Sequence, residues 1–533
     1  MAPLGNGNSH RVAWRYRTGG SVISVAATAD CRLIAAGSVD RFVYLLDRHG
    51  TLLWKAEQDN EVWATAISAD GSLIIAGTAR KNPAFGSINV LDRSGANCAR
   101  AVLGAPVWSV AVHEKYVAAT SWDGCVRVYE YLGGLLNELL CVHVGEKGVY
   151  GLTFVPCDLR SGRKLAVAAA VYEKGIAWID ISTGVVKYVL DDDGIYGMKS
   201  LRGGDVVAAT RRGGATLYNA EGAIHRLPSW SSRPLCGISM SSNGLLISAG
   251  SFGGTLTVGT RAGDILWSFA TDGEVWSCSM SDDGRWLCAG SGDKTIHFVE
   301  NGCTASFAVD LLALEARLSE TAASESTIEE FLDLCVMNGL AQYAAIKLRQ
   351  ILQGKPGFLQ DLLVKLYQRH LEHNPEDRLM HLSLGELLKG KGEYQRAVQE
   401  FQRAAVDPIL KVKALGHAGD CFAQLGLSVA ARSCYRRARD ADLATDEKRV
   451  LYNLARSYDE NGLHAEAFAH YQLLIAVDVD YAAAWEKTEL LGTGRGDFVA
   501  SDIRRSDYTG ITVGLLGPNA PRLRDMAEQL RPI

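Results

Sequence analysis

A short phrase recurs seven times in the first three hundred residues of this 533-residue chain and constrains its fold more than any other feature. The copies begin roughly 40 to 46 residues apart, and most carry an apolar residue, an aromatic ring and then a small residue. Repetition at this period indicates a string of similar supersecondary units rather than one ordinary core. The copies are Val62-Trp63-Ala64-Thr65, Val107-Trp108-Ser109-Val110, Val149-Tyr150-Gly151-Leu152, Ile195-Tyr196-Gly197-Met198 and Val275-Trp276-Ser277-Cys278, with weaker ones at Val22-Ile23-Ser24-Val25 and Leu235-Cys236-Gly237-Ile238.

Each copy is followed by the same order of turns and short strands. A turn such as Asp70-Gly71 separates it from an apolar strand such as Leu73 to Thr78, and two further strands resemble Val43 to Asp47 and Leu52 to Ala56. Four short strands in each period are what a propeller blade requires. Both faces of every blade are apolar, and a closed ring covers all of them. The sequence therefore predicts an all-β, seven-bladed propeller over residues 1–308.

Two segments compete to close this ring. Val12 to Thr18 resembles the outer strands of other blades and carries Trp14, so we expect it to complete the last blade beside Thr295 to Val299. Thr304 to Val309 could occupy the same edge, and the sequence does not choose between the two.

The repeats also resemble known propeller families. Val43 to Asp47, continued by Gly50 to Trp54, resembles the quinoprotein-like (PQQ-like) repeats, whereas Ala69 to Gly77 is similar to a WD40 repeat. The full WD40 signature is missing, since no Gly-His pair opens the blades and no Trp-Asp pair ends the third strands. Quinone-dependent dehydrogenases also use an adjacent cysteine pair that this chain lacks. The resemblance therefore implies a fold and not an activity, and we predict no catalytic residue, no cofactor and no metal.

Near Val309 the pattern changes to Leu, Ala, Glu and Gln at helical spacing. From about Leu379 it resembles tetratricopeptide (TPR) repeats, which are helix pairs of about 34 residues. We expect a helical linker and capping region at 309–378, an all-α TPR-like solenoid at 379–491 with Trp485 opening a capping helix, and a linker with a C-terminal tail at 492–533. The residues that carry the resemblance are Leu384, Gly385, Leu388, Gly392, Tyr394, Ala397, Phe401 and Ala404, then Gly419, Phe422, Gly426, Ala431, Tyr435 and Ala438, then Leu454, Ala455, Tyr458, Gly462, Ala467 and Tyr471.

The aromatic position of the recurring phrase supplies the candidate binding site. If it lies at the start of each inner strand, five rings gather at one mouth of the central channel, where they could dock a peptide or a flat ligand. The alternative, which the general behaviour of repeats favours, is that the rings pack between neighbouring blades as structural wedges. The five residues are Trp63, Trp108, Tyr150, Tyr196 and Trp276.

Three other polar groups have structural interpretations that we prefer to chemical ones. The aspartates that end third strands would lie on separate blades, so we interpret them as turn formers rather than as acids of an active site. The acidic run at 191–193 could contact a metal or a basic peptide, but a solvated loop is the plainer interpretation. A histidine pair on one helix could hold a metal, but no third ligand is in view and we expect surface histidines. These residues are Asp47, Asp92 and Asp180, then Asp191, Asp192 and Asp193, then His370 and His373.

Composition limits the partners and the compartment. The formal net charge is -5 and no long Lys/Arg run occurs, so there is no electrostatic reason to expect a nucleic-acid partner. We find no apolar stretch suited to a signal peptide or to membrane insertion. The twelve cysteines are scattered and mostly lie in apolar segments, which fits a reducing, cytoplasmic setting.

Together these features predict a non-catalytic scaffold or adaptor in a multiprotein assembly. One propeller face would bind one protein or peptide, and the groove of the TPR-like array would bind another. Several alternatives stay open. The chain resembles the propeller–solenoid subunits of vesicle coats and ciliary transport complexes, although its solenoid is short. It could also be a regulatory or sensor partner of a separate effector enzyme in prokaryotic signalling or defence, or a propeller that binds a small ligand in its channel.

Overall fold

The computed structural model describes residues 9–477 except 81, 83, 147, 156–164, 192, 202–203, 220, 320–324, 353–355 and 440–446, together with Ala484 and Lys487. Trp485 and the tail at 492–533 lie outside the described residues. The chain divides into two compact units, Met1–Ala344 and Ala345–Ile533. The boundaries 308/309, 378/379 and 491/492 that the sequence suggests therefore stay predictions.

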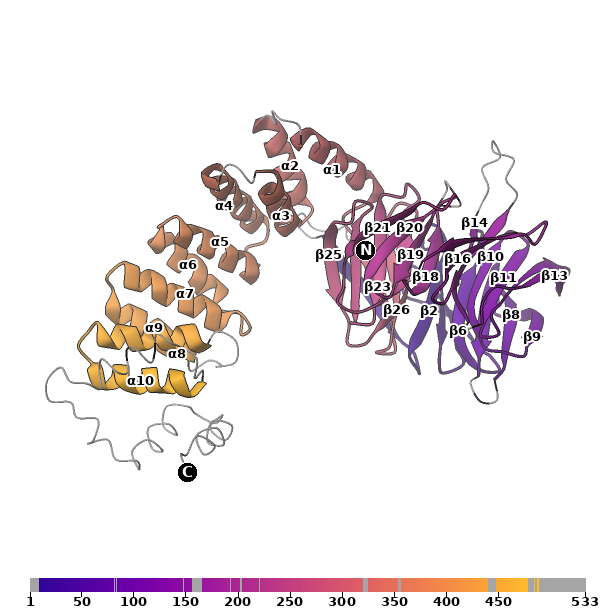
Figure 1. Cartoon of the computed structure of the whole chain (residues 1–533), viewed down its shortest axis with the longest axis horizontal. Helices are drawn as coiled ribbons and strands as arrows, with labels where there is room; N and C mark the ends of the chain where they lie inside the picture. Colours follow the sequence, from indigo (N-terminus) through magenta and orange to yellow (C-terminus); the bar gives the residue numbers. More distant parts are fainter. Residues whose placement is uncertain are drawn as a thin grey trace, which may run out of the picture. The chain divides into compact units, whose positions relative to one another are not determined.

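The first unit contains seven four-stranded antiparallel sheets, which are the blades of a propeller (Figure 1). Each of the seven innermost strands contacts the inner strands of two neighbouring blades, and β26 contacts β2, so the ring is closed. The inner strands are β2 (Val22–Ala27), β6 (Glu61–Ile67), β10 (Val107–His113), β14 (Val149–Val155), β18 (Ile195–Ser200), β22 (Leu235–Met240) and β26 (Val275–Met280).

The second and third strands of the blades are short, and apart from β12 they are almost fully buried, because neighbouring blades cover both of their faces. The second strands are β3 (Leu33–Ser38), β7 (Leu73–Ala79), β11 (Tyr116–Ser121), β15 (Ala166–Val171), β19 (Val206–Thr210), β23 (Leu246–Ser251) and β27 (Trp286–Ser291). The third strands are β4 (Phe42–Asp47), β8 (Gly86–Asp92), β12 (Cys125–Leu132), β16 (Gly175–Asp180), β20 (Gly214–Tyr218), β24 (Thr255–Thr260) and β28 (Thr295–Asn301).

The outer strands alternate between packed and exposed residues, as expected where only one face of an edge strand is covered. They are β5 (Leu52–Glu57), β9 (Asn97–Leu103), β13 (Leu135–His143), β17 (Val186–Leu190), β21 (Ile224–Ser229), β25 (Ile265–Ala270) and β1 (His10–Arg17).

The ring closes through the leading segment of the chain. Strand β1 pairs antiparallel with β28, from His10 opposite Asn301 to Arg17 opposite Thr295, and becomes the outer strand of the last blade. This confirms the first of the two expected closures. The competing segment is helical instead: Thr304 caps a helix by accepting a hydrogen bond from the Phe307 amide, so it cannot serve as a strand.

Tryptophans of the outer strands fasten one blade to the next. Trp14 of β1 donates to the Arg48 carbonyl at 2.8 Å, in the turn between β4 and β5 of the first blade, and stacks on Phe298 at 4.9 Å. Trp54 repeats the contact with the Arg93 carbonyl at 2.8 Å. Gly50 has φ +84° and approaches the Trp14 ring so closely that a Cβ atom there would lie 2.9 Å from it. Trp14 therefore completes the seventh blade and also attaches it to the first.

Ten helices follow the propeller in the described part of the chain. Helix α1 (Ala305–Leu318) and α2 (Glu325–Met337) belong to the first unit, and α3 (Ala341–Ile351) spans the division between the units. No described helix is long and apolar enough to cross a membrane.

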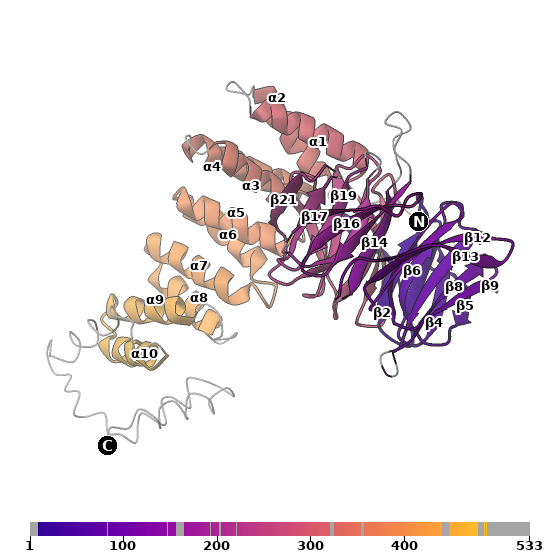
Figure 2. The same cartoon turned by 45° about the vertical axis from the view of Figure 1, so that its right-hand side comes forward.

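Helices of the second unit stack as successive antiparallel pairs (Figure 2). Where α5 and α6 cross, a Cβ atom on Gly385 would lie 2.6 Å from the Phe401 ring, and a Cβ atom on Gly419 of α7 would lie 2.4 Å from the Tyr435 ring of α8. Small residues at these crossings therefore let the paired helices approach closely. The helices are α4 (Pro356–His373), α5 (Arg378–Gly390), α6 (Tyr394–Ala404), α7 (Lys411–Gln424), α8 (Ser428–Arg439), α9 (Glu447–Asp459) and α10 (His464–Val477).

Removing the closing tryptophan should destabilise the propeller more than an exposed change on the same strand. We expect Trp14→Ala to lower the free energy of unfolding by about 3 kcal/mol, because it removes the ring packing and one hydrogen bond. Arg17→Ala, on the exposed side of β1, should change it by less than about 0.5 kcal/mol. Thermal unfolding of the full chain measures both, and equal effects would contradict this role for Trp14.

The helix crossings offer a second comparison. Gly419→Ala should cost about 1–3 kcal/mol, since the new methyl group overlaps the Tyr435 ring. Gly390→Ala is the matched control: it lies at the end of α5 with no atom within 4 Å of the new Cβ, and it should leave stability unchanged or raise it by about 0.5–1 kcal/mol. Loss of helical circular dichroism on heating reports both. A Gly419→Ala chain that melts like Gly390→Ala would refute close packing at this crossing.

Candidate functional site

Every inner strand carries an irregularity in its pairing close to its first residue. The register shifts between Val62 and Ala64 in β6, between Val107 and Ser109 in β10, and at the equivalent place in the other five blades. A β-bulge leaves the extra residue outside the ladder and redirects its side chain. In five blades that extra residue is the aromatic one predicted from the sequence. The same backbone irregularity therefore sets the direction of all five rings.

The five predicted rings lie in one network at the same end of the channel. Trp63 meets Trp108 edge to face at 5.1 Å, Trp108 meets Tyr150 at 4.8 Å, and Tyr150 meets Tyr196 at 5.9 Å. The sixth blade has Cys236 at this position, and Phe252 bridges the gap, 5.7 Å from Tyr196 and 4.9 Å from Trp276. The rings thus pack against rings of neighbouring blades, and they also line the channel. The surroundings expected of structural wedges and those expected of a channel mouth are both present. We call this network the aromatic mouth.

Sequence reasoning missed three members of the aromatic mouth. Trp122, Tyr172 and Phe252 follow the second strands β11, β15 and β23, and they contact Trp108, Tyr150 and Trp276 respectively. Trp122 is also the most accessible of the large rings there, with 38% of its surface exposed. Aligning the residue after each second strand would have revealed them, because that position returns to the same end of the blade as the start of the inner strand.

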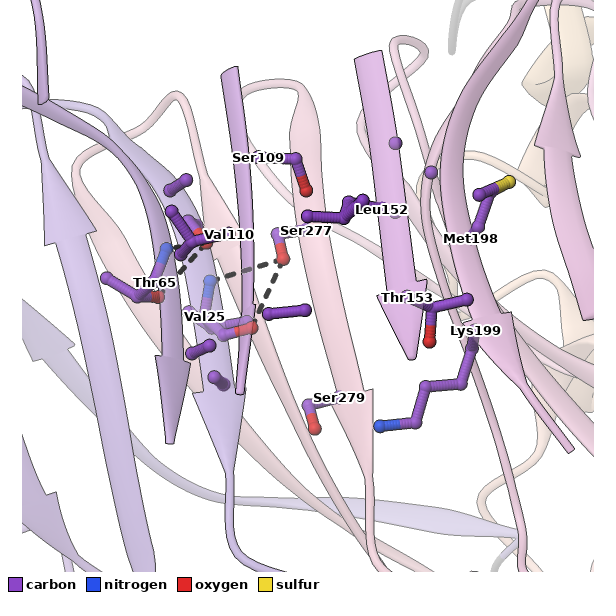
Figure 3. A pocket seen from close by; sticks show the side chains of 18 of the residues that line it. Val25, Thr65, Ser109, Val110, Leu152, Thr153, Met198, Lys199, Ser277 and Ser279 are labelled. Carbon is purple, nitrogen blue, oxygen red and sulfur yellow. Dashed lines mark hydrogen bonds between the residues drawn. The ribbon is translucent and has the colours of Figure 1, made fainter. Parts of the chain in front are cut away.

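Behind the mouth the channel holds a cavity of about 840 Å³, lined by all seven inner strands (Figure 3). Its wall consists largely of small and hydroxyl-bearing residues that join adjacent blades. The Ser24 hydroxyl accepts a hydrogen bond from the Thr65 amide at 2.9 Å, and the Ser277 hydroxyl accepts one from the Val25 amide at 3.2 Å. Short side chains on the inner strands therefore keep the lumen open, while their hydroxyls satisfy backbone groups of the next blade.

Titratable groups in this cavity are shifted toward their neutral forms. Burial, with the neighbouring tyrosines, raises the pKa of Tyr150. Burial raises the pKa of the Cys278 thiol to about 11 and also raises that of Cys236. Burial lowers the pKa of Lys199, which extends into the cavity from β18, although the negative charge of Asp282 opposes this. Neutral rings and protonated thiols suit binding better than nucleophilic chemistry.

Aspartates at the ends of third strands form turns, as predicted. Asp47 accepts hydrogen bonds from the His49 and Thr51 amides at 2.8 and 2.9 Å, and Asp92 and Asp180 make the same kind of contact. These bonds hold the carboxylate oxygens within their own turns.

The prediction of a solvated acidic loop is wrong for the two residues of the run that the structure describes, since Asp192 lies outside them. Asp191 and Asp193 are buried. Asp191 accepts hydrogen bonds from the Tyr218 hydroxyl and from Arg226, both at 2.8 Å, and so connects the fourth blade to the fifth. Burial alone would raise the pKa of Asp191, but these bonds and one from the Asp193 amide hold it below its usual value.

The histidine pair is likewise only half as predicted. His373 is exposed, but His370 is 4% exposed and contacts the Asp377 carboxylate at 2.9 Å. Asp377 is the N-cap of α5, so His370 joins α4 to the start of the next helix. His370 is therefore buried at a contact between two helices and is not a surface histidine.

First helices of the pairs in the second unit share an ionic network. Lys389 of α5 contacts Asp420 of α7 at 2.6 Å, and Asn453 of α9 donates to the same carboxylate at 2.8 Å. Lys413 and His417 contact Glu386 at 2.8 and 3.3 Å. The His417 hydrogen bond and the nearby Lys413 charge lower the pKa of Glu386 to about 2. The surface where α5, α7 and α9 meet is therefore polar and charged.

Comparison with known proteins identifies the repeat type in part of the ring. Residues 98–130 and 263–299 match the family model described as WD domain, G-beta repeat. Each match runs from the outer strand of one blade, β9 or β25, to the third strand of the next, β12 or β28. WD40 repeats are thus present in a seven-bladed propeller, while neither the helical pairs nor the PQQ-like type is named by a family model.

Among solved structures, the crystal structure of the WD40 beta propeller domain of Doa1 is similar, with a TM-score of 0.47 and 16% sequence identity. The match covers 55% of this chain and 97% of that one. No curated protein matches the sequence significantly.

Proposed function

We propose that the protein is a non-catalytic interaction scaffold that docks a peptide segment of a partner protein at the aromatic mouth. The observation that carries this proposal is the row of contacting aromatic rings from Trp63 to Trp276. These rings border an open cavity of about 840 Å³ and do not fill it. Tryptophan and tyrosine provide large rigid contact areas at little cost in side-chain entropy, and they dominate the binding energy of many interfaces. Trp122 and the rings around it would act as such anchors.

The helical pairs would provide the second docking surface. Their 34-residue spacing, with glycine against an aromatic ring at two successive crossings, supports a TPR-like array. The surface formed by α5, α7 and α9 carries both signs of charge in the Lys389–Asp420 and Lys413–Glu386 pairs. Such a surface suits a polar or charged segment better than an apolar helix. A scaffold that joins two partners in this way fits a reducing, cytoplasmic setting, because eight of its described cysteines are buried as free thiols.

A second candidate function is binding of a small ligand in the channel. The cavity volume falls within the range of about 300–1,000 Å³ that is usual for small-molecule sites. The protein would then act as a sensor, and a partner could read the bound state at the mouth.

Capture of partners by variants of the full chain tests the scaffold proposal. Trp122→Ala should reduce the amount of a stoichiometric partner retained from native lysate by about tenfold or more, because it removes an accessible anchor of the mouth. Val185→Ala is the control: its side chain is 65% exposed just before the outer strand β17, at the end of the blade opposite the mouth, and it should retain the partner fully. Quantitative mass spectrometry compares the two, and equal retention by both variants would refute docking at the mouth.

A further inference from the structure

Lys199 departs from its six equivalents in the repeat. It directly follows the four-residue recurring phrase in the fifth blade, on the inner strand β18. The residues at this place in the other blades are all small: Ala26, Ala66, Ala111, Thr153, Ser239 and Ser279. A ring of short side chains is explained by the open lumen that it surrounds. The open lumen does not explain a single lysine among them, since the repeat itself does not require a charge there.

The lysine projects into the cavity, with its amino group on the side of Ser279 (Figure 3). Among the described residues the ammonium group makes no hydrogen bond and no ion pair, in contrast to Lys389 and Lys115, which pair with carboxylates at 2.6 Å. Apart from His113 it is the one basic side chain among the described residues that line the cavity.

The charge of Lys199 has no partner of opposite sign in contact with it among the described residues. Its side chain is exposed to the channel, and the protein atoms around it favour the neutral form and lower its pKa. Asp282 contributes a compensating negative field without a direct contact. An anion that enters the channel would supply the missing partner, since hydrogen bonds between an ammonium group and an anion are stronger than those between neutral groups.

We infer that the channel binds a ligand through a carboxylate at Lys199, with the apolar or aromatic part of that ligand lying toward the aromatic mouth. One ammonium group matches a single negative charge. A phosphate dianion would call for more cations, and for the forked donors of arginine. This inference rests on the proposed function in one respect, the placement of the apolar part of the ligand at the aromatic mouth. It adds the chemical group by which the channel recognises the ligand.

The length of the ligand follows from the strand geometry. Tyr196 and Lys199 are three residues apart on β18, which corresponds to about 10 Å along the channel. An aromatic ring joined to a carboxylate by a short aliphatic chain spans much of this distance, and so do the last three residues of an extended peptide. The shared chemistry is a carboxylate at the end of an apolar or aromatic group, supplied either by a small metabolite or by the C-terminus of a partner.

The test measures binding of two pairs of probes to the full chain near neutral pH. The first pair is indole-3-butyrate and its neutral carboxamide, titrated by calorimetry. The second is a pool of acetylated tripeptides with free C-terminal carboxylates and the same pool with C-terminal amides, with retained members identified by mass spectrometry. We expect at least one carboxylate probe to bind about tenfold or more tightly than its amide. Binding of the indole acid alone would indicate a metabolite, and binding of the free peptides alone would indicate a protein C-terminus.

Variants then assign the preference to Lys199. Lys199→Met should abolish it, Lys199→Arg should retain most of it, and Lys187→Met on the outer strand β17 should leave it unchanged. Lys199→Met should melt no lower than the natural chain, because the exposed Lys199 side chain makes no hydrogen bond or ion pair with the described residues. The inference is overturned if neither carboxylate probe binds, if acid and amide bind equally, or if Lys199→Met keeps the preference.

Failure here is distinguishable from failure of the proposed function. A partner whose capture is lost in Trp122→Ala but unchanged in Lys199→Met, with no preference for carboxylate probes, would support docking at the mouth and reject the anion site. A carboxylate preference that depends on Lys199, together with partner capture that Trp122→Ala does not change, would support the anion site and reject docking at the mouth.

Discussion

Pairing of β1 with β28 is the interaction on which the rest of the first unit depends. The strand nearest the start of the described chain and the last strand of the ring lie almost three hundred residues apart, yet they form one blade. Each blade needs a neighbour on both faces, so an open ring would expose two apolar sheet faces to water. Trp14 reinforces the closure because it stacks on Phe298 within the seventh blade and donates to the Arg48 carbonyl of the first.

A closed ring also determines what the inner strands can do. Since the second and third strands fill the space between blades, the inner strands are free to carry small residues toward the axis, and a cavity remains. The bulge at the start of each inner strand then turns the following side chain toward the channel opening. The same backbone device, repeated around the ring, produces the aromatic mouth, while Lys199 is a departure from the repeat deeper in the channel.

The sequence predicted what its repeats encode. The seven blades, the closure by Val12 to Thr18, the helix pairs and the turn-forming role of Asp47 all follow from local patterns of turns, alternation and spacing, and the structure confirms them. The clustering of Trp63 and Trp108 at one end of the channel could be foreseen as one of two alternatives, because equivalent residues of a ring lie at equivalent heights.

What the sequence did not reveal depends on single contacts between distant residues. Asp191 is buried because Tyr218 and Arg226, on a neighbouring blade, supply its hydrogen bonds, and His370 is buried because it meets the cap residue Asp377. Phe252 joins Tyr196 to Trp276 because the sixth blade has Cys236 where five other blades have a ring. Nothing in local composition distinguishes such residues from exposed ones, since their partners come from other repeats or from the next helix.

The central claim is that the aromatic mouth is the surface of the propeller that contacts a partner. Site-specific photo-crosslinking tests it most directly, with a benzophenone amino acid placed in the full chain either at Trp122, at the mouth, or at Val185, which is 65% exposed just before the outer strand β17. The account predicts that a partner in native lysate cross-links from position 122 and not from position 185. Cross-linking from position 185 alone, or equally from both, would contradict it.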